Sequence, residues 1–279
     1  MNTSSLDRIH AQILWDRLLA VVEEQAQTLV RTAFSTTVRE AGDISAGVFD
    51  TRGRMLAQAV TGTPGHVNAM AASVGFFLER HPVGTLRPGD VLLTNDPWHG
   101  TGHLNDFTVV TPVFRAERVV ALFAATSHIA DVGGLGFGPD GRQVYEEGLN
   151  IPIGYLYRGG EPNTVLLDIL RANVRDPRAA EGDLHSLAAC NDAGAARLLA
   201  TLGPGVVTGV DIDAGTLLFV TDLSVSGILG WSFEAGRHII RPYLLAVKTG
   251  VSPDPRILEV SGDVLVDEAR HIEVALARA

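Results

Sequence analysis

The chain has one cysteine among its 279 residues, Cys190. A single thiol excludes a disulfide within the chain and a zinc site built from several cysteines. No histidine stands beside Cys190 in the sequence, so we expect a buried core thiol and not a reactive one. This sparing use of cysteine fits a reducing compartment.

Basic residues are also few. The 22 Lys and Arg stand against 32 Asp and Glu, which gives a net charge of −10, and they form no basic block. Nucleic acids and anionic membranes attract clustered basic residues, so we expect neither as a partner. No uncharged apolar stretch approaches the roughly 20 residues of a membrane span, and the first twelve residues contain no apolar signal core. We therefore expect a soluble, cytoplasmic protein.

Hydrophobic residues, by contrast, make up 46% of the chain and charged residues 19%. This composition is typical of a packed globular core. At this length the chain could form one large domain or two modest ones. The pattern of apolar residues changes beyond Gly203, so we divide the chain into a domain over 1–202 and an unassigned C-terminal extension over 203–279, which could still belong to the same domain.

Helical and extended segments are interspersed along the chain. Apolar residues recur at three- and four-residue intervals in the segments that we expect to be helical: 6–36, 67–80, 168–175 and 181–202. Short apolar runs predict a hairpin around Asp-Thr-Arg-Gly (50–53) and further strands at 90–94, 107–114, 119–126 and 206–220. A strand and an acidic helix are expected within 257–279. The order lacks a strict βαβ alternation, which predicts an α+β fold with mixed or antiparallel sheets and packed helices.

Side chains that can bind a metal ion or transfer protons are concentrated in residues 89–131. This span holds three histidines and four aspartates, namely His99, His103, His128, Asp90, Asp96, Asp106 and Asp131. Imidazole and carboxylate groups together suit a borderline or hard divalent metal. Several glycines interrupt the span and allow tight turns.

Three of these residues are expected to meet through a β-hairpin. Asp106 precedes the strand at 107–114, and His128 follows the strand at 119–126. A hairpin places the start of its first strand beside the end of its second, so His103 and Asp106 should approach His128. The three side chains would form a mononuclear metal site with positions open for water or substrate.

Three further candidates stand earlier in the chain. Glu40 and Asp43 precede the first expected strand, where acidic residues more often serve helix ends and turns. His66 follows a glycine and precedes the helix at 67–80, a place where side chains often face a cleft. Taken alone, His66 is more often a hydrogen-bonded loop residue than a functional one.

Six stretches together carry a resemblance to a known family. They are Arg-Glu-Ala-Gly-Asp-Ile-Ser (39–45), Gly-His-Val-Asn-Ala-Met (65–70), Thr-Asn-Asp-Pro-Trp-His-Gly-Thr-Gly-His-Leu-Asn-Asp (94–106), Ser-His-Ile-Ala-Asp-Val-Gly-Gly (127–134), Tyr-Glu-Glu-Gly-Leu-Asn-Ile-Pro (145–152) and Asn-Val-Arg-Asp-Pro with Gly-Asp-Leu (173–184). In this order and spacing, residues 36–200 resemble the hydantoinase B family. That family includes the B-type part of 5-oxoprolinases and the α subunits of acetone and acetophenone carboxylases.

The resemblance implies a metal held by His103, Asp106 and His128, the same three residues that the hairpin selects. The metal is manganese in the carboxylase α subunits; zinc and iron stay open here. The resemblance also implies an A-type ATPase subunit as partner, so that ATP acts only through that subunit, and a cyclic amide as substrate. Further implied site residues are Glu40, Asp43, His66 and Asp131, as proton-handling or positioning groups.

The sequence also departs from the family. Members are usually about twice this length, and Asn105 and Ile129 stand where many have proline and a second histidine. Three functions therefore stay open. The first is the B-type subunit of an ATP-dependent hydantoinase or 5-oxoprolinase, a hydrolase that opens a cyclic amide. The others are an acetone-carboxylase-like α component and a shortened, non-catalytic member that acts through association.

Overall fold

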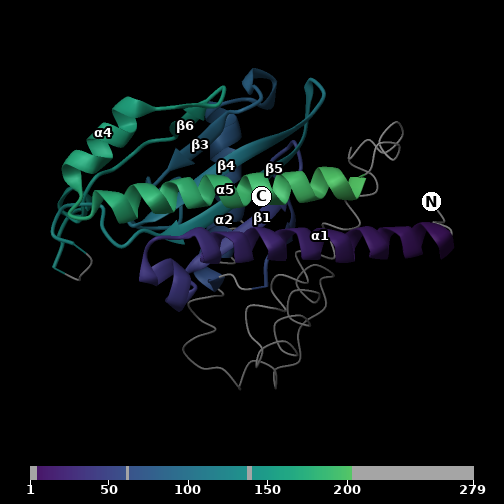
Figure 1. The fold of residues 1–279 in the computed structure, drawn as a ribbon, viewed down its shortest axis with the longest axis horizontal. Coiled ribbons are helices and arrows are strands. Elements are labelled where there is room, and N and C mark those ends of the chain that lie inside the picture. Colours follow the sequence, from purple (N-terminus) through teal and green to yellow (C-terminus); the bar gives the residue numbers. More distant parts are fainter. Residues whose placement is uncertain (1–4, 61–62, 137–139, 203–279) are drawn as a thin grey trace, which may run out of the picture. The chain divides into compact units, whose positions relative to one another are not determined.

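The computed structural model describes residues 5–60, 63–136 and 140–202 of the chain (Figure 1). These residues form helices packed on a seven-stranded antiparallel sheet of order β2-β1-β5-β4-β3-β6-β7, which confirms the α+β fold. The proposed extension 203–279 and its expected strands and helix lie outside the described residues. Among the described residues, no helix combines the length and the apolar character needed to cross a membrane.

Five of the seven strands follow the expected segments closely, and the last two lie outside those segments. The strands are β1 (Ile44–Phe49), β2 (Met55–Gln58), β3 (Val91–Thr94), β4 (Asp106–Arg115), β5 (Arg118–His128), β6 (Gly154–Arg158) and the short β7 (Glu161–Pro162). β4 and β5 are the longest, and they pair along their whole length from Asp106↔His128 to Arg115↔Arg118. The hairpin that the sequence predicts at this place is therefore present.

The helices also agree with the expectation, with shifts at their ends. They are α1 (Ser5–Thr32), the π-helical turn η1 (Thr37–Ala41), α2 (Pro64–Arg80), the 3₁₀ turn η2 (Val83–Thr85), α3 (Val144–Glu147), α4 (Thr164–Asn173) and α5 (Pro177–Leu202). The first helix ends four residues earlier than its apolar pattern predicts. The backbone N–H groups of Phe34 and Ser35 donate to the Asp183 carboxylate of α5, at 2.7 and 3.1 Å, so they do not continue the helix.

Helices cover both faces of the sheet. In Figure 1, α1 and α5 run side by side across the face turned toward the viewer. Side chains alternate between the faces of a strand, and Ile44, Ala46 and Val48 of β1 belong to the core beneath these two helices. Gly47 faces the other way, since a Cβ there would lie 3.5 Å from Met70 of α2. α2 therefore packs on the opposite face.

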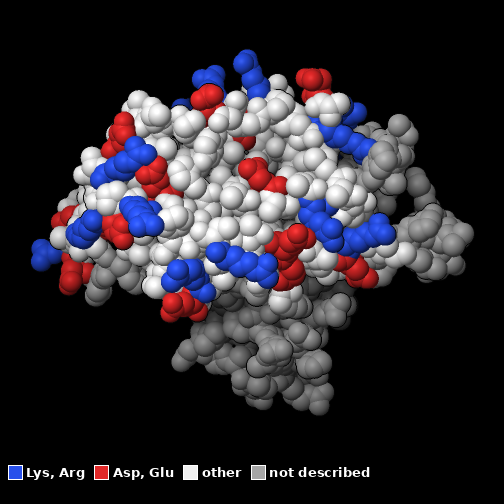
Figure 2. Space-filling view, in the orientation of Figure 1, with Lys and Arg blue, Asp and Glu red and all other residues white. Residues whose placement is uncertain are grey.

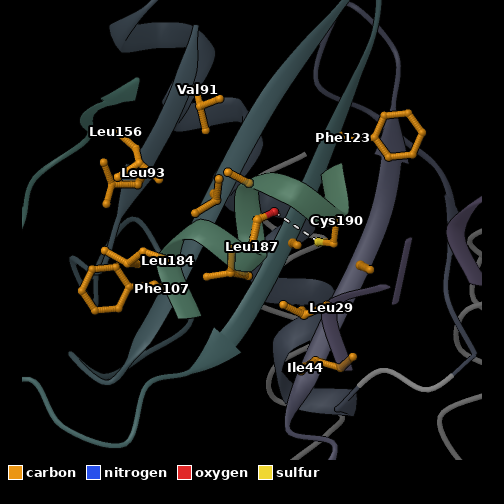
Figure 3. Packing of buried hydrophobic residues seen from close by; sticks show 14 of the residues in the cluster. Leu29, Ile44, Val91, Leu93, Phe107, Phe123, Leu156, Leu184, Leu187 and Cys190 are labelled. Atoms are coloured by element: carbon orange, nitrogen blue, oxygen red, sulfur yellow. Dashed lines mark hydrogen bonds between the residues drawn. The ribbon is translucent and has the colours of Figure 1, made fainter. Parts of the chain in front are cut away.

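The core between the sheet and the helices α1 and α5 is aliphatic and aromatic. Figure 3 shows Phe107 and Phe123 of the central hairpin with Leu184 and Leu187 of α5 among the labelled side chains. Cys190 is fully buried here and its thiol donates to the Leu187 carbonyl oxygen at 3.1 Å. The burial confirms the expected core position, and it raises the pKa of this thiol.

One polar contact joins α1 and α5 to the sheet through this core. Gln25 and Asn191 are fully buried, and Gln25 Nε2 donates to Asn191 Oδ1 at 2.7 Å and to the Ala124 carbonyl oxygen at 3.0 Å. Asn191 Nδ2 donates to the carbonyl oxygens of Val109 and Phe123 at 3.1 and 3.3 Å. These hydrogen bonds fix the helices against the middle of the hairpin.

On the outer surface of this face, Lys and Arg side chains are interspersed with Asp and Glu (Figure 2). The described residues visible there form no continuous basic patch, as the low content of basic residues predicts.

Candidate metal centre

The site is built around the carboxylate of Asp106, the first residue of β4. Its side chain is 1% exposed. Asp106 Oδ1 lies 3.1 Å from Nδ1 of His128, and Oδ2 lies 3.2 Å from Nε2 of His103 and 3.0 Å from Nε2 of His66. Three imidazole groups therefore converge on one buried carboxylate.

Local backbone structure explains how His103 and His128 reach Asp106. Asp106 and His128 are directly paired across the hairpin, so their side chains leave the sheet on the same face. A tight turn connects His103 to the strand, because the Asp106 N–H donates to the His103 carbonyl oxygen at 3.2 Å. The rings of His103 and His128 have centroids 5.1 Å apart.

The side chains of His103, Asp106 and His128 are suitably placed to hold a metal ion. Each offers one ligand atom, and these atoms lie within 4.8 Å of one another. Two imidazoles and one carboxylate form a donor set that suits iron, manganese or zinc and leaves further coordination positions open. His128 and Asp106 are buried, whereas the His103 side chain is 41% exposed. The residues present therefore fit the divalent metal that the sequence predicts.

His66 and Asp43 approach the same carboxylate from the α2 side. His66, in the first turn of α2, lies between the two acids: its Nε2 is 3.0 Å from Asp106 Oδ2 and 3.7 Å from Asp43 Oδ1. Thr63 Oγ1 donates to Asp43 Oδ1 at 2.7 Å. The His128 N–H donates to the Asp43 carbonyl oxygen at 3.2 Å, so Asp43 is also tied to the end of β5.

The electrostatics of the cluster favour a charged carboxylate beside protonated imidazole. Burial acts to raise the pKa of Asp106, but the hydrogen bonds with His128 and His66 and the charges of His66 and His103 lower it well below its ordinary range. For His66, burial acts to lower the pKa, and the hydrogen bond and charge of Asp106 raise it above the ordinary 6.5. The same negative charge is available to a bound cation.

The other two predicted site residues make different contacts. The Glu40 side chain is 72% exposed and lies 3.8 Å from the Arg39 guanidinium. Asp131 accepts hydrogen bonds from the Gly133 N–H at 2.9 Å and from Arg175 Nη1 at 2.8 Å, as well as from the Arg175 N–H. Asp131 is thereby engaged in holding the turn at 131–134 to the segment before α5.

Thr101 is a site residue that the sequence analysis did not select. Its hydroxyl donates to Asp106 Oδ2 at 2.8 Å. Only its position in the sequence could have indicated this role: Thr101 lies between the two glycines of Gly-Thr-Gly-His, two residues before the predicted ligand His103. Threonine is common in such loops, so this signal does not distinguish a site residue from an ordinary turn residue.

Asn95 anchors the loop that carries His103 and Thr101. Its side chain is fully buried and makes three hydrogen bonds. Oδ1 accepts from the Ile151 N–H at 2.6 Å, and Nδ2 donates to the carbonyl oxygens of Leu104 and Leu149 at 2.7 and 2.8 Å. One asparagine thus joins both ends of the loop 95–105 to the segment before β6.

The sequence model of the family described as hydantoinase B/oxoprolinase matches residues 7–204 of the chain. The chain belongs to this family. The B-type subunit of a putative D-/L-hydantoinase from a Pseudomonas species is 29% identical over 201 residues, which are 70% of this chain and 34% of that protein. 5-Oxoprolinase 1 of Arabidopsis thaliana is 37% identical over 148 residues, 52% of this chain and 12% of that protein. The chain thus spans about a third or less of these relatives.

Two solved structures share the fold of this family member. The ATP-dependent caprolactamase from Pseudomonas jessenii aligns with a TM-score of 0.68 at 25% identity, over 82% of this chain and 39% of that one. A nucleotide-free acetone carboxylase aligns with a TM-score of 0.66 at 19% identity, over 87% of this chain and 30% of that one. At this identity the second likeness concerns the fold alone.

Proposed function

We propose that the chain is the metal-binding B-type component of an ATP-dependent hydrolase that opens a cyclic amide. The observation that carries the proposal is the convergence of His103, His128 and His66 on the buried carboxylate of Asp106. Membership in the hydantoinase B/oxoprolinase family supports the reaction class, and the names of the relatives and of the caprolactamase support a cyclic amide as substrate.

In this proposal His103, Asp106 and His128 hold a divalent ion, with manganese, zinc and iron as the candidates. When bound, such an ion polarises a carbonyl oxygen or lowers the pKa of a water molecule toward neutrality. The His103 side chain is 41% exposed and those of the other two residues are buried, so solvent reaches the cluster on the His103 side.

The chain's own residues prepare the site for this chemistry. Thr101 and His66 hold Asp106 Oδ2 in place by hydrogen bonds of 2.8 and 3.0 Å. His66 can hold a proton between the two carboxylates, since its Nε2 lies 3.0 Å from Asp106 Oδ2 and 3.7 Å from Asp43 Oδ1. Asp131 would act as a positioning residue through Arg175, and Glu40 would act only if the complete assembly brings its exposed carboxylate to the substrate.

The proposed partner is an A-type ATPase subunit, so that ATP is consumed by the partner and not by this chain. The Pseudomonas relative is named as one subunit of a hydantoinase, and the caprolactamase is named as ATP-dependent. Both names support a separate subunit that consumes the ATP. A hetero-oligomer in the cytoplasm is part of the same proposal. We prefer amide hydrolysis to ketone carboxylation, because the likeness to acetone carboxylase carries the fold alone.

The test is a reconstitution with a competent A-type subunit. Purified chain, partner, ATP and a divalent metal are combined with hydantoin or 5-oxoproline, and ring opening and ATP hydrolysis are followed together. The proposal predicts ring opening that requires both proteins and ATP, and that His128→Ala abolishes. A chain that gives no stimulation of the partner would favour a non-catalytic role through association. Fixation of labelled bicarbonate into a ketone would favour the carboxylase function.

A further inference from the structure

Two of the three proposed metal ligands, Asp106 and His128, form the last pair of the β4–β5 hairpin. Pairs in an antiparallel ladder alternate between those that exchange two backbone hydrogen bonds and those that exchange none. The Asp106 N–H donates to the His103 carbonyl oxygen, and the His128 N–H donates to the Asp43 carbonyl oxygen, both at 3.2 Å. Neither N–H is donated across the pair, so the neighbouring pairs must hold Asp106 and His128 together.

The neighbouring pair at the open end of the hairpin consists of Asn105 and Ile129. The Ile129 N–H donates to the Asn105 carbonyl oxygen at 2.7 Å, as in a regular ladder. In a regular pair the return bond would come from the backbone N–H of Asn105. Here the Ile129 carbonyl oxygen accepts from the side chain instead, since Asn105 Nδ2 lies 2.8 Å from it. Asn105 thus completes the pair with one hydrogen bond from its main chain and one from its side chain.

Both residues of this contact are buried. Asn105 is 7% exposed and Ile129 is 1% exposed. The Ile129 side chain belongs to the core beneath α1 and α5, which fixes the end of β5. The hydrogen bonds of Asn105 tie the start of β4 to this fixed point. Loss of the side-chain donor would leave a buried carbonyl oxygen without this partner, which costs more free energy than the loss of an exposed hydrogen bond.

The contact acts on two proposed ligands at once. Asn105 directly precedes Asp106 in the chain, and Ile129 directly follows His128. Oδ1 of Asp106 and Nδ1 of His128 lie 3.1 Å apart on one face of the hairpin. Element ends open at a lower free-energy cost than the middle of a core strand. If the pair of Asn105 and Ile129 opened, the two backbones would separate and the ligand atoms would move apart.

We propose that Asn105 is a positioning residue of the metal centre: its side-chain amide closes the open end of the hairpin and holds Asp106 and His128 at the spacing seen in the structure. This inference deepens the proposed function, on which it rests, because it assigns the preorganisation of two ligands to a residue outside the ligand set. Asparagine suits this role because its amide donates a hydrogen bond, whereas a leucine side chain of similar size has no donor.

Metal affinity and stability, measured on Asn105→Leu, test the inference. Leucine removes the donor and adds no charge. Affinity for manganese and for zinc is measured by competition with a chelator, and the stability of the metal-free protein is measured by its urea midpoint. Asn105→Leu should weaken metal binding about 2- to 10-fold. Asn105→Ala, which also lacks the donor, should do the same and replaces the leucine variant if that variant does not fold.

Asn163→Leu is the matched control. Asn163 Nδ2 donates to the Tyr155 carbonyl oxygen at 3.0 Å, and Oδ1 accepts from the Leu166 N–H at 3.1 Å, at the start of α4. The control therefore removes an asparagine that also bonds to the main chain, but not beside a proposed ligand. Asn163→Leu should lower the urea midpoint and leave metal affinity unchanged.

A second measurement follows the ligand pair itself in metal-free protein. In an antiparallel pair without backbone hydrogen bonds the two strands approach closely, so the α protons of Asp106 and His128 should give a strong nuclear Overhauser cross-peak. The cross-peak should be present in wild type and Asn163→Leu, and weakened or lost in Asn105→Leu. A residue that only contributes stability would leave it unchanged in the folded protein. Unchanged metal affinity or an unchanged cross-peak in Asn105→Leu would overturn the inference.

Metal binding by the wild type separates this inference from the proposed function. If wild type and Asn105→Leu bind metal equally tightly, the positioning role of Asn105 is refuted and the metal centre stands. If wild type binds no metal after loading, the metal centre itself fails, and the positioning role fails with it.

Discussion

Replacement of Asn95 by alanine should destabilise the protein and its metal centre together. The substitution removes three hydrogen bonds of 2.6 to 2.8 Å from a fully buried side chain and leaves the Ile151 N–H and the carbonyl oxygens of Leu104 and Leu149 without this partner. At about 1 kcal/mol for each hydrogen bond, the free energy of unfolding should fall by about 3 kcal/mol. The loop that carries His103 would also lose its anchor, so metal affinity should fall.

Urea unfolding of Asn95→Ala and wild type at pH 7, with and without metal, measures both effects. Asn173→Ala is the matched control: Asn173 is an exposed asparagine on α4 whose side chain bonds only within its own helix, to Ile169. The control should change the free energy of unfolding by less than about 0.5 kcal/mol. A loss below that figure for Asn95→Ala, or full retention of metal affinity, would refute the view that this asparagine organises the loop.

Three further predictions concern charge and the buried polar contact. In metal-free protein, Asp106→Asn should lower the free energy of unfolding by about 1–3 kcal/mol at pH 5. This loss should shrink as the pH rises through the raised pKa of His66, because the deprotonated imidazole no longer needs the carboxylate. Asp131→Asn should cost about 1 kcal/mol at pH 7. Burial acts to raise the Asp131 pKa, but hydrogen bonds from Gly133 and Arg175 lower it below the ordinary value of 3.8, so in pH-dependent denaturation curves this cost should begin to fall near pH 3.8 and disappear as the pH falls through the lowered pKa. A double-mutant cycle of Gln25→Ala and Asn191→Ala should show a coupling energy of about 0.5–3 kcal/mol; additive losses would contradict the 2.7 Å contact.

The convergence of His103, Asp106 and His128 could be predicted from the sequence because the determining geometry is local. A hairpin with a short turn fixes which strand ends are neighbours. The exact pairing of Asp106 with His128 depends in addition on the irregularity between Val113 and Phe114, which shifts the register by one residue and which the sequence does not reveal. His103 lies only three residues before Asp106, within one turn. The apolar patterns likewise predicted the helices and strands, since one side of each element is buried.

Contacts between distant elements were not predictable in the same way. The approach of His66 to Asp106 depends on the packing of α2 against the face of the sheet opposite α1 and α5. Periodicity indicates which side of a helix is buried and not which neighbour covers it. The early end of α1 also depends on a contact between distant elements. The backbone N–H groups of Phe34 and Ser35 donate to the Asp183 carboxylate, which belongs to a helix some 150 residues later.

The metal content of the purified chain tests the central claim most directly. Mass spectrometry is applied to wild type, His103→Ala, His128→Ala and the control His185→Ala, whose ring contacts Tyr157 and Glu181 away from the cluster. We expect about one metal ion per chain in wild type and control, and none in the two ligand variants. A wild type that holds no metal after loading with manganese, zinc or iron, or ligand variants that retain it, would contradict the proposed metal centre.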